Sequence, residues 1–121
     1  MPKALVVDDN RVMADTLCAM LNLLGVEAQA AYGARSALFK LESFTPDVLL
    51  LDLHMPGIEG YDVMAYLRRD PRLAEVPIIV VTSEAQQEAH RKARQTGALT
   101  VIVKPPTLQQ LEDALRRAGV L

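Results

Sequence analysis

Four short runs of apolar residues, together rich in β-branched side chains, recur along the chain. Such runs are typical of strands that are covered on both faces of a sheet. The four runs are residues 4–7, 48–51, 78–81 and 101–103. A fifth run, residues 26–31, alternates Val26 and two alanines with Glu27 and Gln29, which is the pattern of a strand with one face in water. We therefore expect five strands, with the strand at 26–31 on an edge of the sheet.

Between these runs the apolar residues recur every three or four positions, which is the spacing of amphipathic helices. The expected helices cover residues 13–24, 34–42, 59–69, 84–96 and the stretch that follows Thr107. Gly25 comes where a left-handed residue would end the first helix. The fourth helix carries Glu88 and Lys92 at the spacing of an ion pair. Thr107 and Gln110 have the spacing of a capping box, which marks the beginning of the last helix.

Strands and helices alternate strictly along the chain. Such alternation predicts a parallel sheet with right-handed crossovers and helices on both faces. Five strand-helix units are too few to close an eight-stranded barrel. The expected fold class is therefore α/β, a doubly wound five-stranded parallel sheet. We expect residues 1–121 to form one domain, because this length suits one core and no linker, repeat or low-complexity tract interrupts it.

The chain is slightly acidic, with a formal net charge of -2 and an isoelectric point near 5.6. This charge gives no long-range attraction to nucleic acid or to an anionic membrane, so we expect protein partners instead. Neither a secretory segment nor a membrane span can be drawn in the sequence, which favours a cytoplasmic location. Cys18 is the only cysteine in the sequence, which excludes an internal disulfide and a multi-cysteine metal site.

Polar side chains follow four of the apolar runs, at the strand ends where ligands bind in open parallel sheets. They are Asp8, Asp9, Asp52, Thr82 and Lys104. Three crowded carboxylates repel one another, and a bound cation would remove that repulsion. Oxygen ligands at a partly hydrated site that also takes phosphate oxygens favour Mg²⁺. Lys104 and Thr82 suit phosphoryl oxygens, and Asp52 could be the nucleophile that forms an acyl phosphate.

Four motifs occur in order: Asp8-Asp9, the segment DLHMPGIEG at 52–60, Thr82, and Lys104-Pro105. In this combination the chain resembles the receiver domain of two-component response regulators, of the chemotaxis-regulator kind, over essentially its whole length. The resemblance implies a flavodoxin-like fold with strand order 2-1-3-4-5. It also implies a signalling switch rather than an enzyme, with self-catalysed phosphotransfer and slow hydrolysis of its own acyl phosphate.

The resemblance further implies roles for the acidic residues. Asp52 would be the phosphoacceptor, supplied by a phosphohistidine of a sensor histidine kinase or of a histidine phosphotransfer protein. Asp9, Asp52 and the backbone carbonyl of His54 would bind Mg²⁺ directly. Asp8 would act on the ion through water.

For the other matching residues, the resemblance implies contacts with the phosphoryl group. Thr82 and Lys104 would hold its oxygens, and the bond between Lys104 and Pro105 would be cis. The signal would pass to a downstream protein target or to a fused output domain, without direct binding of nucleic acid and without a membrane.

Two positions depart from the family pattern. The family commonly has an aromatic residue three positions before the lysine, whose inward or outward state couples to the threonine, and here that position is Val101. We therefore expect phosphorylation to move Thr82 and its loop without an aromatic rotamer change. Pro106 stands where Phe often follows the lysine-proline pair.

Other interpretations stay open. A phosphorylation-independent interaction module would have no evident need for Asp8, Asp9 and Lys104 together. A Mg²⁺-dependent phosphatase with an aspartyl-phosphate intermediate is less favoured, because haloacid dehalogenase enzymes usually carry an Asp two residues after the nucleophile, where this chain has His54. Taken alone, the Asp9 segment could simply cap a helix. The remaining histidine, His90, is expected on a solvated helix face.

Overall fold

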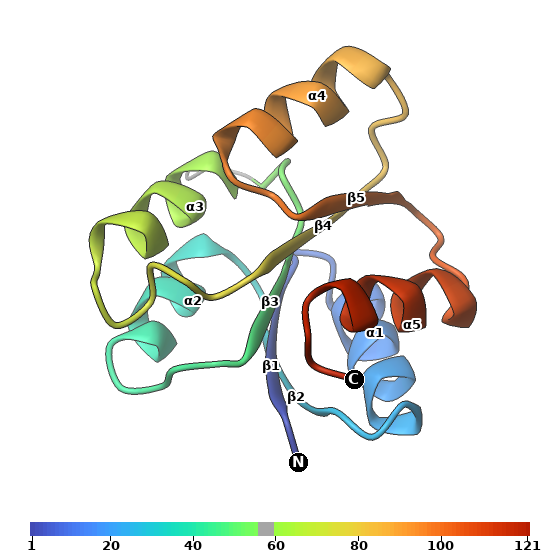
Figure 1. Ribbon diagram of the computed structural model, residues 1–121, viewed down its shortest axis with the longest axis horizontal. Coiled ribbons are helices and arrows are strands. Elements are labelled where there is room, and N and C mark those ends of the chain that lie inside the picture. The colour runs from blue at the N-terminus through green and yellow to red at the C-terminus, as the bar shows by residue number, and fades with distance from the viewer. Residues whose placement is uncertain (56–59) are drawn as a thin grey trace.

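The computed structural model describes residues 1–55 and 60–121, and within them the centre of the fold is one sheet of five parallel strands (Figure 1). The strands are β1 (Lys3–Val7), β2 (Glu27–Ala31), β3 (Val48–Leu51), β4 (Ile78–Thr82) and β5 (Thr100–Val103). Their order across the sheet is β2-β1-β3-β4-β5. Each neighbouring pair is parallel. The predicted strand order 2-1-3-4-5 is confirmed.

In the described part of the chain, five helices cover the two faces of this sheet (Figure 1). They are α1 (Arg11–Leu23), α2 (Ala34–Leu41), α3 (Gly60–Arg69), α4 (Gln87–Thr96) and α5 (Leu108–Arg117). Helices α1 and α5 pack on one face, and α2, α3 and α4 lie on the other. This arrangement confirms the doubly wound α/β fold, because each strand is followed by a helix that crosses over one face of the sheet.

Successive residues of each inner strand point to opposite faces, so the chain builds two apolar cores. In β1, Leu5 and Val7 pack toward α2 and α3, whereas Ala4 and Val6 pack toward α1 and α5. All four side chains are buried. A run that is apolar at every position is therefore what a strand covered on both faces requires.

The strand β2 lies at one edge of the sheet, as its alternating pattern predicts. Glu27 and Gln29 are exposed, while Ala28 and Ala30 are half-buried against the α1 and α5 side. The polar residues of this strand thus face water, and small residues face the core.

Helix α4 differs from its sequence-based prediction in where it begins. The prediction began it at Glu84, but the first helical residue is Gln87. Two side chains bind the backbone of the preceding turn: Thr82 Oγ1 accepts from the Glu84 N–H at 3.2 Å, and Glu84 Oε1 accepts from the Gln86 N–H at 2.9 Å. Such local bonds give the backbone an alternative to helix formation, and they delay the start of α4.

The predicted ion pair between Glu88 and Lys92 was wrong. Glu88 instead binds Arg91, three positions away, with its two carboxylate oxygens 2.6 Å and 2.8 Å from Arg91 Nη2. Lys92 places its ammonium over the ring of Tyr61 on α3, 4.5 Å from the ring centre. Lys92 therefore takes part in a contact between α3 and α4.

Two further predictions are confirmed in the segment that leads into α5. Thr107 and Gln110 form the predicted capping box of α5, and the peptide bond between Lys104 and Pro105 is cis. The predicted start of the third helix at residue 59 lies outside the described residues, as does the rest of the 56–59 segment.

Burial has a chemical effect on Cys18, a half-buried free thiol on α1. Burial first, and then the charge of Asp15, raise the pKa of this thiol above its ordinary value.

Among the described residues, no helix combines the length and the apolar character needed to cross a bilayer.

Candidate functional site

The register of the sheet brings Asp8 and Asp52 together at the carboxyl ends of neighbouring strands. Val7 of β1 pairs with Leu51 of β3, so the next residue along each strand reaches the same edge. The Asp52 N–H donates to the Val7 carbonyl at 3.0 Å, which extends the pairing by one residue. Ligands bind at this edge of open parallel sheets.

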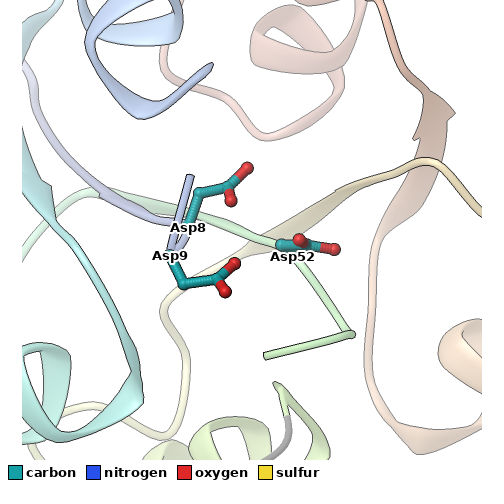
Figure 2. Close-up of side chains that lie close together, drawn as sticks. All are labelled: Asp8, Asp9 and Asp52. Atoms are coloured by element: carbon teal, nitrogen blue, oxygen red, sulfur yellow. The ribbon is translucent and has the colours of Figure 1, made fainter. Parts of the chain in front are cut away.

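Asp9 adds a third carboxylate beside the other two, as Figure 2 shows. One carboxylate oxygen from each of the three residues lies within 4.8 Å of the others. The residue Asp8 is 1% exposed and Asp52 is 7% exposed, whereas Asp9 is exposed. Two carboxylates of the cluster are therefore buried, and the cluster is open to solvent at Asp9.

Lys104 brings a positive charge to this cluster from the end of β5. Its Nζ lies 2.6 Å from Asp8 Oδ2 and 3.2 Å from Asp52 Oδ2. The Lys104 N–H donates to the Thr82 carbonyl at 2.8 Å, which holds the end of β5 against the end of β4. One ammonium group thus bridges the two buried carboxylates.

Burial alone would lower the pKa of Lys104, because it disfavours the charged form. The hydrogen bond to Asp8 and the negative charges of Asp52 and Asp8 act in the opposite direction and outweigh burial. The pKa of Lys104 is therefore raised above its ordinary value, and the side chain is a fixed cation at any physiological pH.

The second oxygen of each buried carboxylate accepts a backbone hydrogen bond. The Asn10 N–H donates to Asp8 Oδ1 at 2.9 Å, and the His54 N–H donates to Asp52 Oδ1 at 3.3 Å. Asn10 also caps α1, because its Oδ1 accepts from the Met13 N–H at 3.0 Å. Asn10 rather than Asp9 is thus the helix cap, which leaves the Asp9 carboxylate for the cluster.

Thr82 is fully buried at the end of β4. Its Oγ1 accepts a hydrogen bond from the Glu84 N–H. A hydroxyl that accepts one hydrogen bond can also donate one. Thr82 therefore has the chemistry to bind an anionic oxygen at this edge of the sheet.

The charges of the cluster fit a divalent cation. Three carboxylates and one ammonium group leave an excess of two negative charges. The ligands on offer are oxygens, which hard cations such as Mg²⁺ prefer. Asp8, Asp9 and Asp52 could therefore hold a metal ion between them.

Comparison with known proteins identifies the family. The sequence model described as "Response regulator receiver domain" matches residues 4–116. The chain belongs to this family. The receiver is 35% identical to the chemotaxis protein CheY of Pseudomonas aeruginosa over 116 residues, which are 95% of this chain and 94% of CheY. It is also similar in structure to chemotaxis response regulator CheY4 of Vibrio cholerae, with a TM-score of 0.89, 29% identity and 98% of both chains covered.

Other relatives of the receiver are longer proteins. It is 30% identical to the phosphate regulon transcriptional regulatory protein PhoB of Rhizobium meliloti, covering 98% of this chain and 54% of PhoB. It is 28% identical to the DNA-binding regulator RpaA of a Synechocystis strain, covering 96% of this chain and 48% of RpaA. The chain thus spans about half the length of these relatives and nearly all of CheY.

Three of the residues singled out in the sequence have side chains that lie outside the carboxylate cluster. The side chain of His54 is exposed, and Pro105 is exposed beside Lys104. Val101 is half-buried and packs against the core under α2, α3 and α4. None of these side chains joins the carboxylate cluster among the contacts of the described residues.

The prediction that His90 lies on a solvated helix face was wrong. The residue is half-buried, and its ring Nε2 lies 2.6 Å from the Glu84 carbonyl oxygen. The contact depends on how the loop after β4 folds back onto α4, and a periodicity of apolar residues carries no information about that loop.

Proposed function

We propose that this receiver domain, residues 1–121, accepts a phosphoryl group on Asp52 and works as a phosphorylation-controlled switch. The observation that carries the proposal is the pairing of one ammonium group with two buried carboxylates beside a third. A phosphoryl group is a dianion, and a site for it needs fixed positive charge next to the nucleophile. Lys104 supplies that charge next to Asp52.

The transfer step uses the carboxylate of Asp52 as the nucleophile. A carboxylate oxygen attacks the phosphorus of a phosphohistidine, and a new P–O bond forms as the P–N bond breaks. The electron pair of the broken bond returns to the imidazole nitrogen of the donor. Hydrolysis of the resulting acyl phosphate by water, catalysed slowly at the same site, regenerates the carboxylate and releases inorganic phosphate.

The neighbouring residues divide the work of holding this group. Lys104 would leave its bond to Asp52 for a phosphoryl oxygen, and the Thr82 hydroxyl would donate to another. Asp9, Asp52 and the His54 carbonyl would hold Mg²⁺ directly, and Asp8 would hold it through water. When bound, the ion supplies positive charge that offsets the charge of the transferring group.

The partners follow from this chemistry. We propose a sensor histidine kinase or a histidine phosphotransfer protein as the donor, because the acceptor site suits a phosphohistidine. The signal would pass to a protein target or to a fused output domain, as in family members that carry one. We place the exchange in the cytoplasm, in line with the similarity to the CheY proteins.

The test is a labelling experiment with acetyl phosphate and Mg²⁺. Intact mass is compared for the wild type, Asp52→Asn and the control Asp113→Asn, which changes an exposed aspartate on α5. We expect one phosphoryl group on the wild type and on Asp113→Asn, and none on Asp52→Asn. The label should be stable in acid and labile in base, which is the behaviour expected of an acyl phosphate.

Two results would point elsewhere. A wild type that takes no label under these conditions would contradict the proposal and favour the phosphorylation-independent interaction module. Rapid release of many equivalents of phosphate would instead identify a phosphatase.

A further inference from the structure

A short series of hydrogen bonds leads from the site to helix α4. The Glu84 N–H donates to Thr82 Oγ1 at 3.2 Å, and His90 Nε2 lies 2.6 Å from the Glu84 carbonyl oxygen. Thr82 ends β4, whereas His90 lies in the first half of α4. One residue, Glu84, therefore links a buried hydroxyl at the carboxylate cluster to a side chain of the helix.

The chemistry of the contact fixes the direction of the second bond. A carbonyl oxygen only accepts hydrogen bonds, so the His90 ring must donate, and its proton must lie on Nε2. Both the neutral ring with this tautomer and the charged ring can make the bond. The contact is thus a donor-acceptor pair in which the ring is the donor.

Few apolar contacts hold the first turns of helix α4 in place. Ala93 is the buried residue of α4, and the other residues of this helix, all described, are half-buried or exposed. Its cap residue Gln86 makes no side-chain capping bond. Elements with few buried apolar contacts are held by small free energies, so the few polar contacts of α4, the His90 bond and the Lys92 contact with Tyr61 among them, have a large share in its position.

Val101 cannot take over this role. Its side chain has no polar atom, so it can neither donate to nor accept from the loop after Thr82. It packs into the apolar core on the α4 side of the sheet. A hydrogen-bonded route from Thr82 to α4 therefore does not run through Val101.

We propose that His90 is the positioning residue that couples Thr82 to α4. The inference rests on the proposed function, because it requires Thr82 to turn toward a phosphoryl group on Asp52. As the Thr82 hydroxyl turns, its bond from the Glu84 N–H lengthens and the loop residue Glu84 shifts. The His90 ring, bound to the Glu84 carbonyl, then carries the first turns of α4 to a new position.

The test compares backbone NMR signals of the full chain with Mg²⁺, before and after addition of beryllofluoride as a phosphoryl analogue. In the wild type we expect the signals of residues 82–85 and of residues 87–91 both to move. In His90→Ala the signals of residues 82–85 should move as before. The signal changes of residues 87–91 should be smaller than in the wild type by a factor of about three or more, because the loss of one net hydrogen bond shifts an equilibrium by about that factor.

Two further variants separate coupling from simple loss of structure. His90→Gln places an amide N–H near the position of Nε2 and should restore the response of residues 87–91. Gln95→Ala, at an exposed position of the same helix, should respond like the wild type. An equal response of residues 87–91 in the wild type and in His90→Ala would overturn the proposal.

A second NMR measurement uses the wild type alone, so it does not depend on whether any variant folds. The ring nitrogen signals of His90 should report a protonated Nε2 and should change on addition of beryllofluoride. If the signals of Thr82 and Lys104 respond and the ring signals do not, the role of His90 is refuted and the proposed function stands. If Thr82 and Lys104 themselves show no response, the proposed function fails, and the coupling fails with it.

Discussion

Among single residues, Lys104 explains how buried acidic groups can share one edge of the sheet. Its side chain is 13% exposed and lies within hydrogen-bond distance of both Asp8 and Asp52. Removing one partner of a buried ion pair leaves an uncompensated charge, which costs about 3 kcal/mol or more. The ammonium group is thus a structural requirement of the site as well as part of its chemistry.

The substitution Lys104→Met should lower the free energy of unfolding by about 3 kcal/mol in the absence of Mg²⁺. Added Mg²⁺ should stabilise the variant more than the wild type, because the three carboxylates repel one another more strongly once the ammonium group is gone. Urea unfolding with and without Mg²⁺ measures both effects. The control Lys3→Met, at an exposed position, should change neither quantity by more than about 0.5 kcal/mol.

The raised pKa of Lys104 fixes the pH range of this contribution. Because the folded state holds the proton more tightly than the unfolded chain, the stabilisation is complete below the unfolded pKa of about 10.4. It is lost only as the pH rises through the still higher pKa of the folded state. A difference between wild type and variant that already disappears near neutral pH would contradict this account.

The residues of the site could be predicted because of where they lie in the sequence. Asp8, Asp52 and Lys104 each follow an apolar run directly, so a correct strand prediction places them on one edge of the sheet. His90 could not be found in this way, because its partner is a backbone carbonyl that no sequence pattern marks. Chemical side chains at strand ends are therefore predictable, and contacts made through an irregular loop are not.

Among the secondary-structure elements, α3 begins in close contact with the strand end that carries Asp52. A Cβ atom on Gly60 would lie 2.5 Å from the Asp52 carbonyl oxygen and 2.8 Å from Leu53 Cα. Both neighbours are backbone atoms, which cannot swing aside as a side chain can. The Gly60 N–H also donates to the Leu53 carbonyl at 3.0 Å, so the start of α3 is tied to the site.

The substitution Gly60→Ala should destabilise the protein by about 3 kcal/mol, because the added methyl group forces the backbone apart. It should also slow labelling by acetyl phosphate, since the displaced backbone belongs to the acceptor residue. The matched control is Gly119→Ala, which has a positive φ of 75° and no atom within 4 Å of its Cβ position. The control should cost about 1 kcal/mol from backbone strain alone and leave labelling unchanged.

Equal labelling rates for Gly60→Ala and Gly119→Ala would show that α3 does not position Asp52. Unfolding in urea and the rate of mass increase with acetyl phosphate measure the two effects separately.

The elements themselves were predicted unequally well. The strands β1, β3 and β4 were located to within one residue at either end, because burial on both faces imposes an unbroken apolar run. The strand β5 was located equally well, but its expected cover on both faces was wrong: it lies at the second edge of the sheet, and Ile102 is its one buried residue. The start of α4 was misplaced because Thr82 and Glu84 bind the backbone of the preceding turn. Such side-chain bonds to the backbone do not change the spacing of the apolar residues that follow. The spacing therefore cannot show where the helix begins.

For the whole molecule, Arg68 joins segments that lie far apart in the sequence. Its guanidinium group donates to the Ala74 and Val76 carbonyls at 2.8 Å and 3.0 Å, before β4, and to the Gly97 carbonyl at 2.9 Å, after α4. The planar group with five N–H donors suits three acceptors in different directions. Arg68 thereby fixes α3, the start of β4 and the end of α4 to one another.

The substitution Arg68→Lys should lower the free energy of unfolding by about 2 kcal/mol, because the donors of an ammonium group lie on one nitrogen, whereas the three carbonyls are bound by two separate nitrogens of the guanidinium. The control Arg69→Lys, at the exposed neighbouring position, should have an effect within about 0.5 kcal/mol. Urea unfolding of both variants measures the difference. A loss for Arg68→Lys no greater than for Arg69→Lys would show that these contacts do not stabilise the fold.

The overall topology could be predicted because it follows from general rules of chain handedness and from the family resemblance. Strict alternation of strands and helices requires parallel strands with right-handed crossovers. The alternating pattern at Glu27 and Gln29 placed β2 at an edge. The contacts of Arg68 were beyond prediction, since its three acceptors are carbonyls from two loops.

The position of Arg68 also determines what kind of motion α4 can make. The Arg68 contact holds the Gly97 end of the helix, and the His90 contact lies near the other end. A displacement at His90 would therefore tilt α4 about Gly97 instead of sliding it along the sheet. About 10 Å of helix separates the two residues, so a shift of about 1 Å at His90 corresponds to a rotation of about 6°. A partner that distinguishes the two states would do so best at the first turns of α4, where this rotation moves the surface furthest.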